Sequence, residues 1–268
     1  MILDQIAEAT RGRVDKAMER IPLSVLRSMI SESRTYGNSF IRDGFAFERA
    51  LKAPEISFIC EVKKASPSKG VISTDFPYLT IARDYEGAGA AAISVLTEPE
   101  YFKGANEYLT EISREVKIPV LRKDFTINEY QIYEAKLIGA DAVLLICSLL
   151  EEKTIKRYIN VCDELGLSAL VEAHNVEEVK MAVLAGARII GVNNRNLQTF
   201  EVDIHNSILL RSLVPKEILF VAESGIKTAE DVSELVEAGV DAILIGETLM
   251  RSENKRDQIS YLRGKGNL

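Results

Sequence analysis

The chain has 268 residues and a formal net charge of −7, with 47% hydrophobic and 27% charged side chains. A negative net charge argues against a nucleic-acid-binding surface, so an anionic ligand would have to be held by local basic side chains and backbone amides. No apolar stretch approaches the roughly 18 uninterrupted residues of a membrane helix, which predicts a soluble protein without a membrane partner.

Residues 1–50 are predicted to form a helical extension. Apolar residues recur at helical spacing over 2–18 and 23–33, and Pro22 separates the two segments. Two interpretations stay open: an extra layer that caps one end of the following domain, or a lid in which residues 22–53 fold over a site. Acidic residues interrupt the short apolar runs, which argues against a secretory signal.

From residue 57 onward, apolar runs alternate with segments of helical period, which is typical of a parallel sheet covered on its faces. Strands are expected at eight places (57–62, 91–96, 120–123, 142–146, 169–172, 189–192, 219–222 and 242–245). Helices are expected between them (78–88, 106–116, 129–138, 151–165, 176–185, 208–213 and 229–237).

An internal repeat indicates how these units are arranged. A short glycine-containing turn recurs between a helix and an apolar strand, at a spacing of roughly 50 residues that fits two strand-helix units per repeat (88–90, 138–140, 185–187 and 238–240). Four such repeats predict an α/β fold, a single (β/α)8 TIM barrel over residues 51–268. A doubly wound open sheet is the competitor, but residues 61–70 lack its glycine-rich turn.

Three scattered cysteines, mostly within apolar runs, favour a reduced cytoplasmic protein over a disulfide-bonded one (Cys60, Cys147 and Cys162).

Five of the apolar runs end in polar or charged side chains. Because an unpaired buried charge costs several kcal/mol, five such endings predict an enzyme whose site lies at the carboxyl ends of the strands. These endings are Glu61 with Lys63, Lys123, Glu172, Asn193 with Arg195, and Glu223 with Ser224.

Two turns on adjacent predicted strands suggest a phosphate site. Ser224 and Gly225 follow the seventh strand, and Gly246 and Glu247 follow the eighth, where barrels commonly bind phosphate through backbone amides. Ordinary turn glycines are the alternative interpretation.

The ammonium and carboxylate groups at the strand ends suit proton transfer on a phosphorylated carbonyl compound. Lys63 and Lys123 would act as acids and Glu61 and Glu172 as bases, although a structural ring of salt bridges or a Schiff-base lysine would use the same residues. Histidine chemistry is not expected, because neither His174 nor His205 is predicted to end a strand. No metal-ligand spacing and no cofactor fingerprint is found.

Six segments closely resemble the indole-3-glycerol-phosphate synthase family. They are residues 61–68 (EVKKASPS), 121–125 (LRKDF), 170–174 (LVEAH), 190–197 (IGVNNRNL), 221–226 (VAESGI) and 245–250 (IGETLM). The resemblance covers nearly the whole chain and includes the N-terminal extension. It implies a cofactor-free step of tryptophan biosynthesis, in which 1-(2-carboxyphenylamino)-1-deoxyribulose 5-phosphate closes a ring and loses CO2 and water.

The resemblance also implies roles for individual residues. Lys123 would be the general acid, Glu172 the leading acid and base candidate, and Glu61 its assistant. The substrate-binding residues would be Lys63 for anions, Asn193 and Arg195 for orientation, Ser224, Gly225, Gly246 and Glu247 for phosphate, and Phe102, Phe125 and Leu144 as walls of the anthranilate ring. Glu247 is expected to use its amide and turn its carboxylate away, and Leu144 has a second interpretation as barrel core.

Three alternatives stay in view. A phosphoribosylanthranilate isomerase would be expected to use a Cys and Asp pair, whereas the first strand here offers Glu61 and Lys63. A non-catalytic partner protein would be expected to lack some site groups, and a regulatory sugar-phosphate-binding barrel would not need Lys123 and Glu172 together. We expect a monofunctional enzyme that is a monomer or a weak homodimer.

Overall fold

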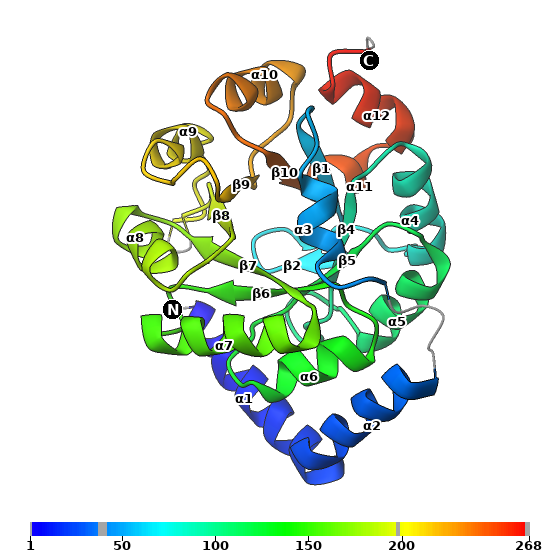
Figure 1. The fold of residues 1–268 in the computed structure, drawn as a ribbon. Helices are drawn as coiled ribbons and strands as arrows, with labels where there is room; N and C mark the ends of the chain where they lie inside the picture. The colour runs from blue at the N-terminus through cyan, green and yellow to red at the C-terminus, as the bar shows by residue number, and fades with distance from the viewer. Residues whose placement is uncertain (1, 37–41, 197–198, 266–268) are drawn as a thin grey trace.

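The computed structural model describes residues 2–36, 42–196 and 199–265, and a closed barrel of parallel strands lies at its centre (Figure 1). Neighbouring strands along the chain pair with one another, and the first strand closes the ring on the last. The strands are β1 (Ser57–Val62), β4 (Ala92–Leu96), β5 (Val120–Lys123), β6 (Ala142–Ile146), β7 (Ser168–Ala173), β8 (Ile189–Asn193), β9 (Leu219–Glu223) and β10 (Ala242–Ile245). The predicted (β/α)8 barrel is confirmed.

Helices surround the barrel and connect successive strands (Figure 1). They are α4 (Tyr78–Gly87), α5 (Asn106–Glu115), α6 (Tyr130–Leu137), α7 (Glu152–Leu165), α8 (Val176–Leu184), α9 (His205–Arg211) and α10 (Ala229–Glu237), and α11 (Glu247–Arg251) and α12 (Lys255–Leu262) follow β10. Helix α9 begins three residues earlier than predicted, because its first turn carries His205 and Asn206 rather than apolar residues.

A small hairpin of β2 (Ala65–Ser66) and β3 (Gly70–Val71) follows β1 and was not predicted. Strands of two residues are too short to show the alternation on which strand prediction depends.

Side chains on the barrel strands alternate between an outer layer beneath the helices and an inner layer inside the barrel. The inner layer is apolar near the amino ends of the strands, and its members are Ile59, Ala92, Leu121, Ala142, Leu170, Ile189, Leu219 and Ala242. Because side chains two residues apart share a face, the next inward position on several strands falls on a charged residue. The alternation therefore places an apolar plug at one end of the barrel and charged groups at the other.

The N-terminal extension forms α1 (Ile2–Arg20), α2 (Leu23–Tyr36) and α3 (Ala46–Leu51). Phe47 and Leu51 of α3 are fully buried in the inner layer, so α3 closes the amino end of the barrel (Figure 1). Helix α2 packs on α6, and α1 reaches the opposite end, where the pocket lies. The lid interpretation is therefore wrong for α3, and residues 37–41 of that segment lie outside the described ranges.

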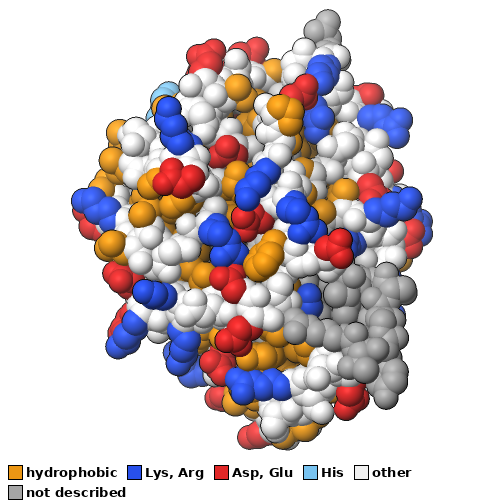
Figure 2. Space-filling view, in the orientation of Figure 1, with side chains coloured by type: hydrophobic (Ala, Val, Ile, Leu, Met, Phe, Trp, Pro, Cys, Tyr) orange, Lys and Arg blue, Asp and Glu red, His pale blue; other side chains and the backbone are white. Residues whose placement is uncertain are grey.

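Lysine and arginine side chains are interspersed with aspartate and glutamate on the face that Figure 2 shows. None of the helices in the described ranges is both long enough and apolar enough to cross a membrane.

We expect Phe47→Ala to lower the free energy of unfolding by about 3–5 kcal/mol, because it removes a fully buried ring from the barrel plug and leaves a cavity. Urea unfolding followed by circular dichroism measures the change. Leu184→Ala on α8 is the control, since this side chain is 68% exposed and should cost little. Equal effects of the two substitutions would contradict the role of α3 as a plug.

Candidate active site

A pocket of about 520 Å³ opens at the carboxyl ends of the barrel strands. All thirteen site residues predicted from the sequence line it: Glu61, Lys63, Phe102, Lys123, Phe125, Leu144, Glu172, Asn193, Arg195, Ser224, Gly225, Gly246 and Glu247. The volume suits a small organic ligand. Residue 197 of the fourth resemblance segment lies outside the described ranges.

Lys123 is the centre of the charged groups. Its Nζ lies 3.0 Å from Glu172 Oε2 and 3.4 Å from Glu223 Oε2, so one ammonium contacts carboxylates from two other strands. The register explains the convergence, because Lys123 stands at the end of β5, and Glu172 and Glu223 occupy inward positions near the ends of β7 and β9.

Burial and charge act against each other in this cluster. Burial alone would lower the pKa of the Lys123 ammonium, but the Glu172 and Glu223 carboxylates outweigh burial and raise it. Burial alone would raise the pKa of Glu172, but the nearby Lys123 charge lowers it instead. Lys123 and Glu172 therefore form a charged pair at neutral pH.

Glu223 behaves in the opposite way. Burial raises the pKa of Glu223, and repulsion from Glu172 raises it further. The attraction of Lys123 lowers it, but not enough to restore its ordinary value. Two buried carboxyl groups beside one lysine thus have pKa values displaced in opposite directions, which suits one for a base and the other for an acid.

Glu223 is predicted from the sequence to end a strand, but it is not among the predicted site residues. The sequence holds one indication of Glu223, which is the glycine Gly191 at an inward position of the neighbouring strand β8. A side chain at 191 would collide with Glu223 Oε1, so the glycine leaves room for this carboxylate.

A second ion pair joins Glu61 and Lys63 on the first strand and the residues just after it. Lys63 Nζ lies 2.6 Å from Glu61 Oε1, and Ser94 Oγ lies 3.4 Å from Glu61 Oε2. A side chain at Gly246 would collide with Glu61 and stand 2.8 Å from Lys63 Nζ. The glycine after β10 therefore allows this pair to lie against the backbone of the turn.

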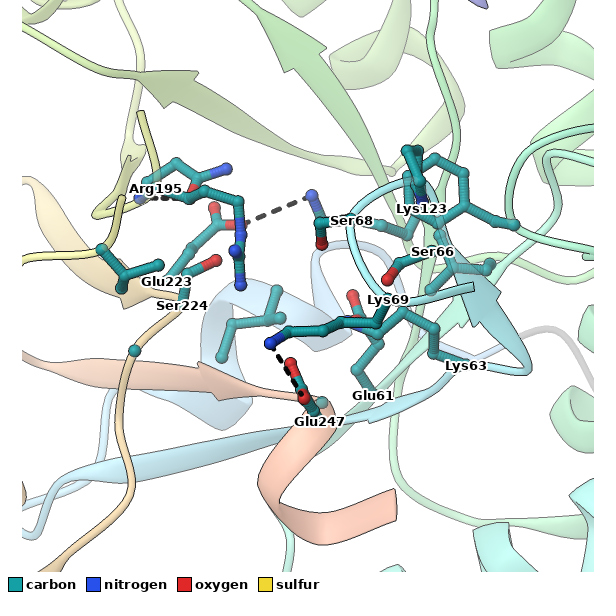
Figure 3. A pocket seen from close by; sticks show the side chains of 18 of the residues that line it. Glu61, Lys63, Ser66, Ser68, Lys69, Lys123, Arg195, Glu223, Ser224 and Glu247 are labelled. Atoms are coloured by element: carbon teal, nitrogen blue, oxygen red, sulfur yellow. Dashed lines mark hydrogen bonds and ion pairs between the residues drawn. The ribbon is translucent and has the colours of Figure 1, made fainter. Parts of the chain in front are cut away.

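Asn193 and Arg195 lie on the side of the pocket formed by β8. Asn193 Nδ2 donates to Glu172 Oε1 over 3.4 Å, and Asn193 Oδ1 accepts from the Arg195 backbone amide over 3.0 Å. Asn193 therefore contacts the catalytic candidate Glu172 directly, and the Arg195 guanidinium projects into the pocket (Figure 3).

The turn after β9 has an unusual backbone. Ser224 has φ 68° and Gly225 has φ 88°, so a non-glycine residue adopts the left-handed conformation at the pocket. Such backbone strain occurs preferentially at functional sites. Asn194 Nδ2 donates to the Ser224 carbonyl over 3.1 Å, which helps to hold this conformation.

Glu247 begins α11 on the other side of the same region. Its Oε1 accepts from Arg251 Nε over 3.1 Å and lies 4.0 Å from Lys69 Nζ, which extends from the loop after β1 (Figure 3). Ser66, Ser68 and Lys69 of the β2–β3 hairpin also line the pocket and were not predicted as site residues.

Aromatic side chains form an apolar wall. The rings of Phe102 and Phe125 have centroids 6.0 Å apart, and Leu144 lines the same pocket while being 2% exposed. The loop that carries Phe102 is held by the buried Glu98. Its carboxylate accepts hydrogen bonds from the backbone amides of residues 100, 101 and 102 over 2.7–3.0 Å.

Helix α1 lines part of the pocket and also holds a neighbouring segment in place. Ile2, Leu3 and Ile6 line the pocket, and Arg13 forms a two-pronged pair with the buried Asp124 at 2.7 and 2.9 Å. Asp124 follows Lys123 directly, so the extension fixes the segment that carries the central lysine.

His174 ends no strand, as predicted, but it lies beside a predicted site residue. His174 comes directly after β7, and its Nε2 lies 3.3 Å from Glu172 Oε1. The expected strand ended one residue early, at Glu172, which hid the proximity. No cluster of side chains suited to a metal ion occurs within residues 2–36, 42–196 and 199–265.

Comparisons with known proteins give a consistent result. The sequence model of the family described as "Indole-3-glycerol phosphate synthase" matches residues 3–262. Proteins of that name from Ruminiclostridium cellulolyticum and Lachnoclostridium phytofermentans are 59% and 55% identical to this chain, over 98% of it and 99% of each relative. A solved 3-hexulose-6-phosphate synthase from Salmonella typhimurium shares the fold with a TM-score of 0.63 and 15% identity, covering 78% of this chain and 97% of that one.

We expect Glu223→Gln to stabilise the protein relative to the wild type as the pH rises above 4.5, the ordinary value of this carboxyl. In this range the unfolded wild type releases a proton that the folded state keeps, so wild-type stability falls until the raised folded pKa is passed. Glutamine does not titrate, and the difference should grow by up to about 1.4 kcal/mol per pH unit.

Urea unfolding between pH 5 and pH 9 measures this difference. The exposed Glu217→Gln is the matched control for loss of a carboxylate. A Glu223→Gln stability that runs parallel to the wild type at every pH would show that Glu223 does not keep its proton in the folded state.

Proposed function

The chain belongs to the indole-3-glycerol phosphate synthase family, and from this premise we propose that it converts 1-(2-carboxyphenylamino)-1-deoxyribulose 5-phosphate into indole-3-glycerol phosphate, CO2 and water. This assigns it to the carbon-carbon lyases of the carboxy-lyase class, in tryptophan biosynthesis. The single observation that supports the chemistry best is the Lys123 ammonium in contact with two buried carboxyl groups, Glu172 and Glu223, inside the pocket.

The first step needs an acid. The ring carbon that bears the carboxylate attacks the C2 carbonyl, whose oxygen gains negative charge as the new carbon-carbon bond forms. Lys123 stays protonated in the cluster, so its ammonium is suited to stabilise and protonate that oxygen. Loss of CO2 then restores the aromatic ring, because the electrons of the broken bond return to it.

The second step removes water and needs an acid and a base together. Glu172 is held ionised by Lys123 and is the candidate to take the proton from the carbon next to the nitrogen. Glu223 retains a proton and is the candidate to give it to the departing hydroxyl group. Glu61, the assistant expected from the sequence, is engaged by Lys63 and would act by holding that lysine.

The remaining pocket residues would bind the substrate. We propose that the turns with Ser224, Gly225, Gly246 and Glu247 hold the phosphate through their amides, and that Lys63 pairs with the anionic groups. Asn193 and Arg195 would orient the ribulose chain and Glu172, and Phe102, Phe125 and Leu144 would pack against the anthranilate ring. Ring closure, decarboxylation and dehydration require only proton transfers, so we propose a reaction without a cofactor.

All these side chains come from one chain, so a monomer is expected to suffice for catalysis, with a weak homodimer as the alternative. A cytoplasmic location fits an amino-acid biosynthetic step and cysteines that remain free.

The test of the function is the fluorescence rise of indole-3-glycerol phosphate when the purified protein meets the carboxyphenylamino deoxyribulose phosphate without metal or cofactor. Saturable product formation is the expected result. Binding of the substrate without product formation would favour a non-catalytic sugar-phosphate-binding barrel. Isomerisation of phosphoribosylanthranilate would instead favour a phosphoribosylanthranilate isomerase.

We expect Lys123→Ala to lower kcat by about 10²–10⁴-fold, because it removes the general acid, while product binding changes little. Steady-state kinetics and calorimetric titration with indole-3-glycerol phosphate measure the two effects. The exposed Lys117→Ala is the control and should match the wild type. Parallel losses of binding and turnover would mean that Lys123 is an anion clamp.

We expect Glu172→Gln to slow the dehydration, because the amide cannot accept the proton that is lost as the indole forms. A decarboxylated intermediate that still carries the hydroxyl group should then accumulate in rapid-quench samples analysed by mass spectrometry. Glu217→Gln on the surface should accumulate none. A slow variant that shows only substrate and product would argue against this role.

A further inference from the structure

His174 lies between two carboxylates at the end of β7. Its Nε2 is 3.3 Å from Glu172 Oε1, and its Nδ1 is 3.0 Å from Glu178 Oε2 in the first turn of α8. The side chain is 14% exposed and does not line the pocket. The ring therefore touches a catalytic candidate from behind, on the side away from the substrate space.

The orientation of the ring is fixed from two helices. The His174 backbone amide donates to the same Glu178 oxygen over 2.8 Å, and Asn175 caps α8 by accepting the Glu178 amide over 2.9 Å. From α9, Asn206 Nδ2 donates to the His174 carbonyl over 3.2 Å. Glu178 is thus held in place, and it determines where the imidazole points.

The surrounding charges keep the ring protonated. Burial alone would lower the pKa of His174, but Glu172 and Glu178 outweigh burial and raise it to about 10. Cys147, at the end of β6, is the other titratable group here: its Sγ lies 3.6 Å from the Glu178 carbonyl, and burial raises the thiol pKa to about 12, so it is neutral. Lys123 and Glu223 lie beyond Glu172.

Glu172 is consequently held at both oxygens. Oε2 contacts Lys123, and Oε1 contacts His174 and, at 3.4 Å, Asn193. Lys123 is expected to give up its proton during the reaction, and at that moment it no longer compensates the charge of Glu172. The imidazolium is a second cation that does not depend on the substrate.

We propose that His174 is a positioning residue for proton transfer at Glu172: its ring links Glu178 to Glu172, fixes the orientation of the catalytic carboxylate and keeps it ionised. The inference rests on the proposed function, because that function gives Glu172 its role. His174 itself touches neither substrate nor reacting atoms.

The pH dependence of kcat tests the proposal, with His174→Gln compared against wild type. Glutamine is polar but carries no charge, so the pKa of Glu172 should rise and the acidic limb of the profile should move upward by about one pH unit. On that limb kcat should fall about tenfold, while KM changes less than about twofold because the ring is outside the pocket.

His205→Gln is the matched control. His205 is also paired with carboxylates, with Nδ1 2.8 Å from Asp203 Oδ1, but it is exposed on α9. Its profile should overlay that of the wild type. A His174→Gln profile that overlays it too would overturn the proposal.

A second readout does not depend on activity. The chain has two histidines, so the imidazole NMR signals of the His205→Gln variant report His174 alone. The ring should titrate near pH 10, and Glu178→Gln should lower that value by about one unit or more. Titration near 6.5 in the unaltered site would overturn the proposal.

The design separates the possible failures. If the wild type makes no indole-3-glycerol phosphate, the proposed function is wrong. The positioning role of His174 in that reaction is then wrong as well, whatever the NMR titration shows. If His174→Gln does not fold, Glu178→Gln decides, because it leaves the imidazole in place. Its acidic limb should move in the same direction, and an unmoved limb would overturn the proposal.

Discussion

The contact between the Lys123 ammonium and the Glu172 and Glu223 carboxyl groups is the interaction on which the site depends. Charged groups inside a barrel lose their hydration, so each must be compensated by a neighbour. One lysine can compensate one carboxylate fully but not two, and the surplus appears as opposite displacements of two pKa values. A single electrostatic mismatch thus places a carboxyl group with a lowered pKa beside one with a raised pKa.

The fold makes this mismatch possible by separating the barrel interior into two ends. An apolar layer fills the amino end, and α3 closes it with Phe47 and Leu51. The carboxyl end carries the charges, and glycines at positions 191 and 246 leave the space that Glu223 and Glu61 occupy. The stable packing is therefore at the end where no chemistry occurs, and the strained or charged groups are at the other.

Segments distant in sequence hold the central residues in place. Arg13 on α1 pairs with Asp124 beside Lys123, Glu98 anchors the loop that carries Phe102, and Glu178 on α8 directs His174 toward Glu172. The supporting residues Arg13, Glu98 and Glu178 themselves do not line the pocket. Such support matters for the proton-transfer groups proposed here, because misplacement of a catalytic group by about 1 Å can cost about 100-fold in rate.

The sequence by itself determined the barrel and the order of its strands. It also identified Lys123 and Glu172, the lysine at the centre of the site and one of the carboxylates that contact it. Buried parallel strands show as apolar runs, and a charge at the end of such a run, as at Lys123 or Glu172, stands out because burial is costly. The sequence did not determine which neighbours surround those charges. Glu223 becomes a site residue only through the register that places it beside Lys123. His174 lies near Glu172 because β7 extends to residue 173, and α1 reaches the pocket only through tertiary packing. Distances between groups on different strands depend on tertiary packing, and pKa values follow those distances.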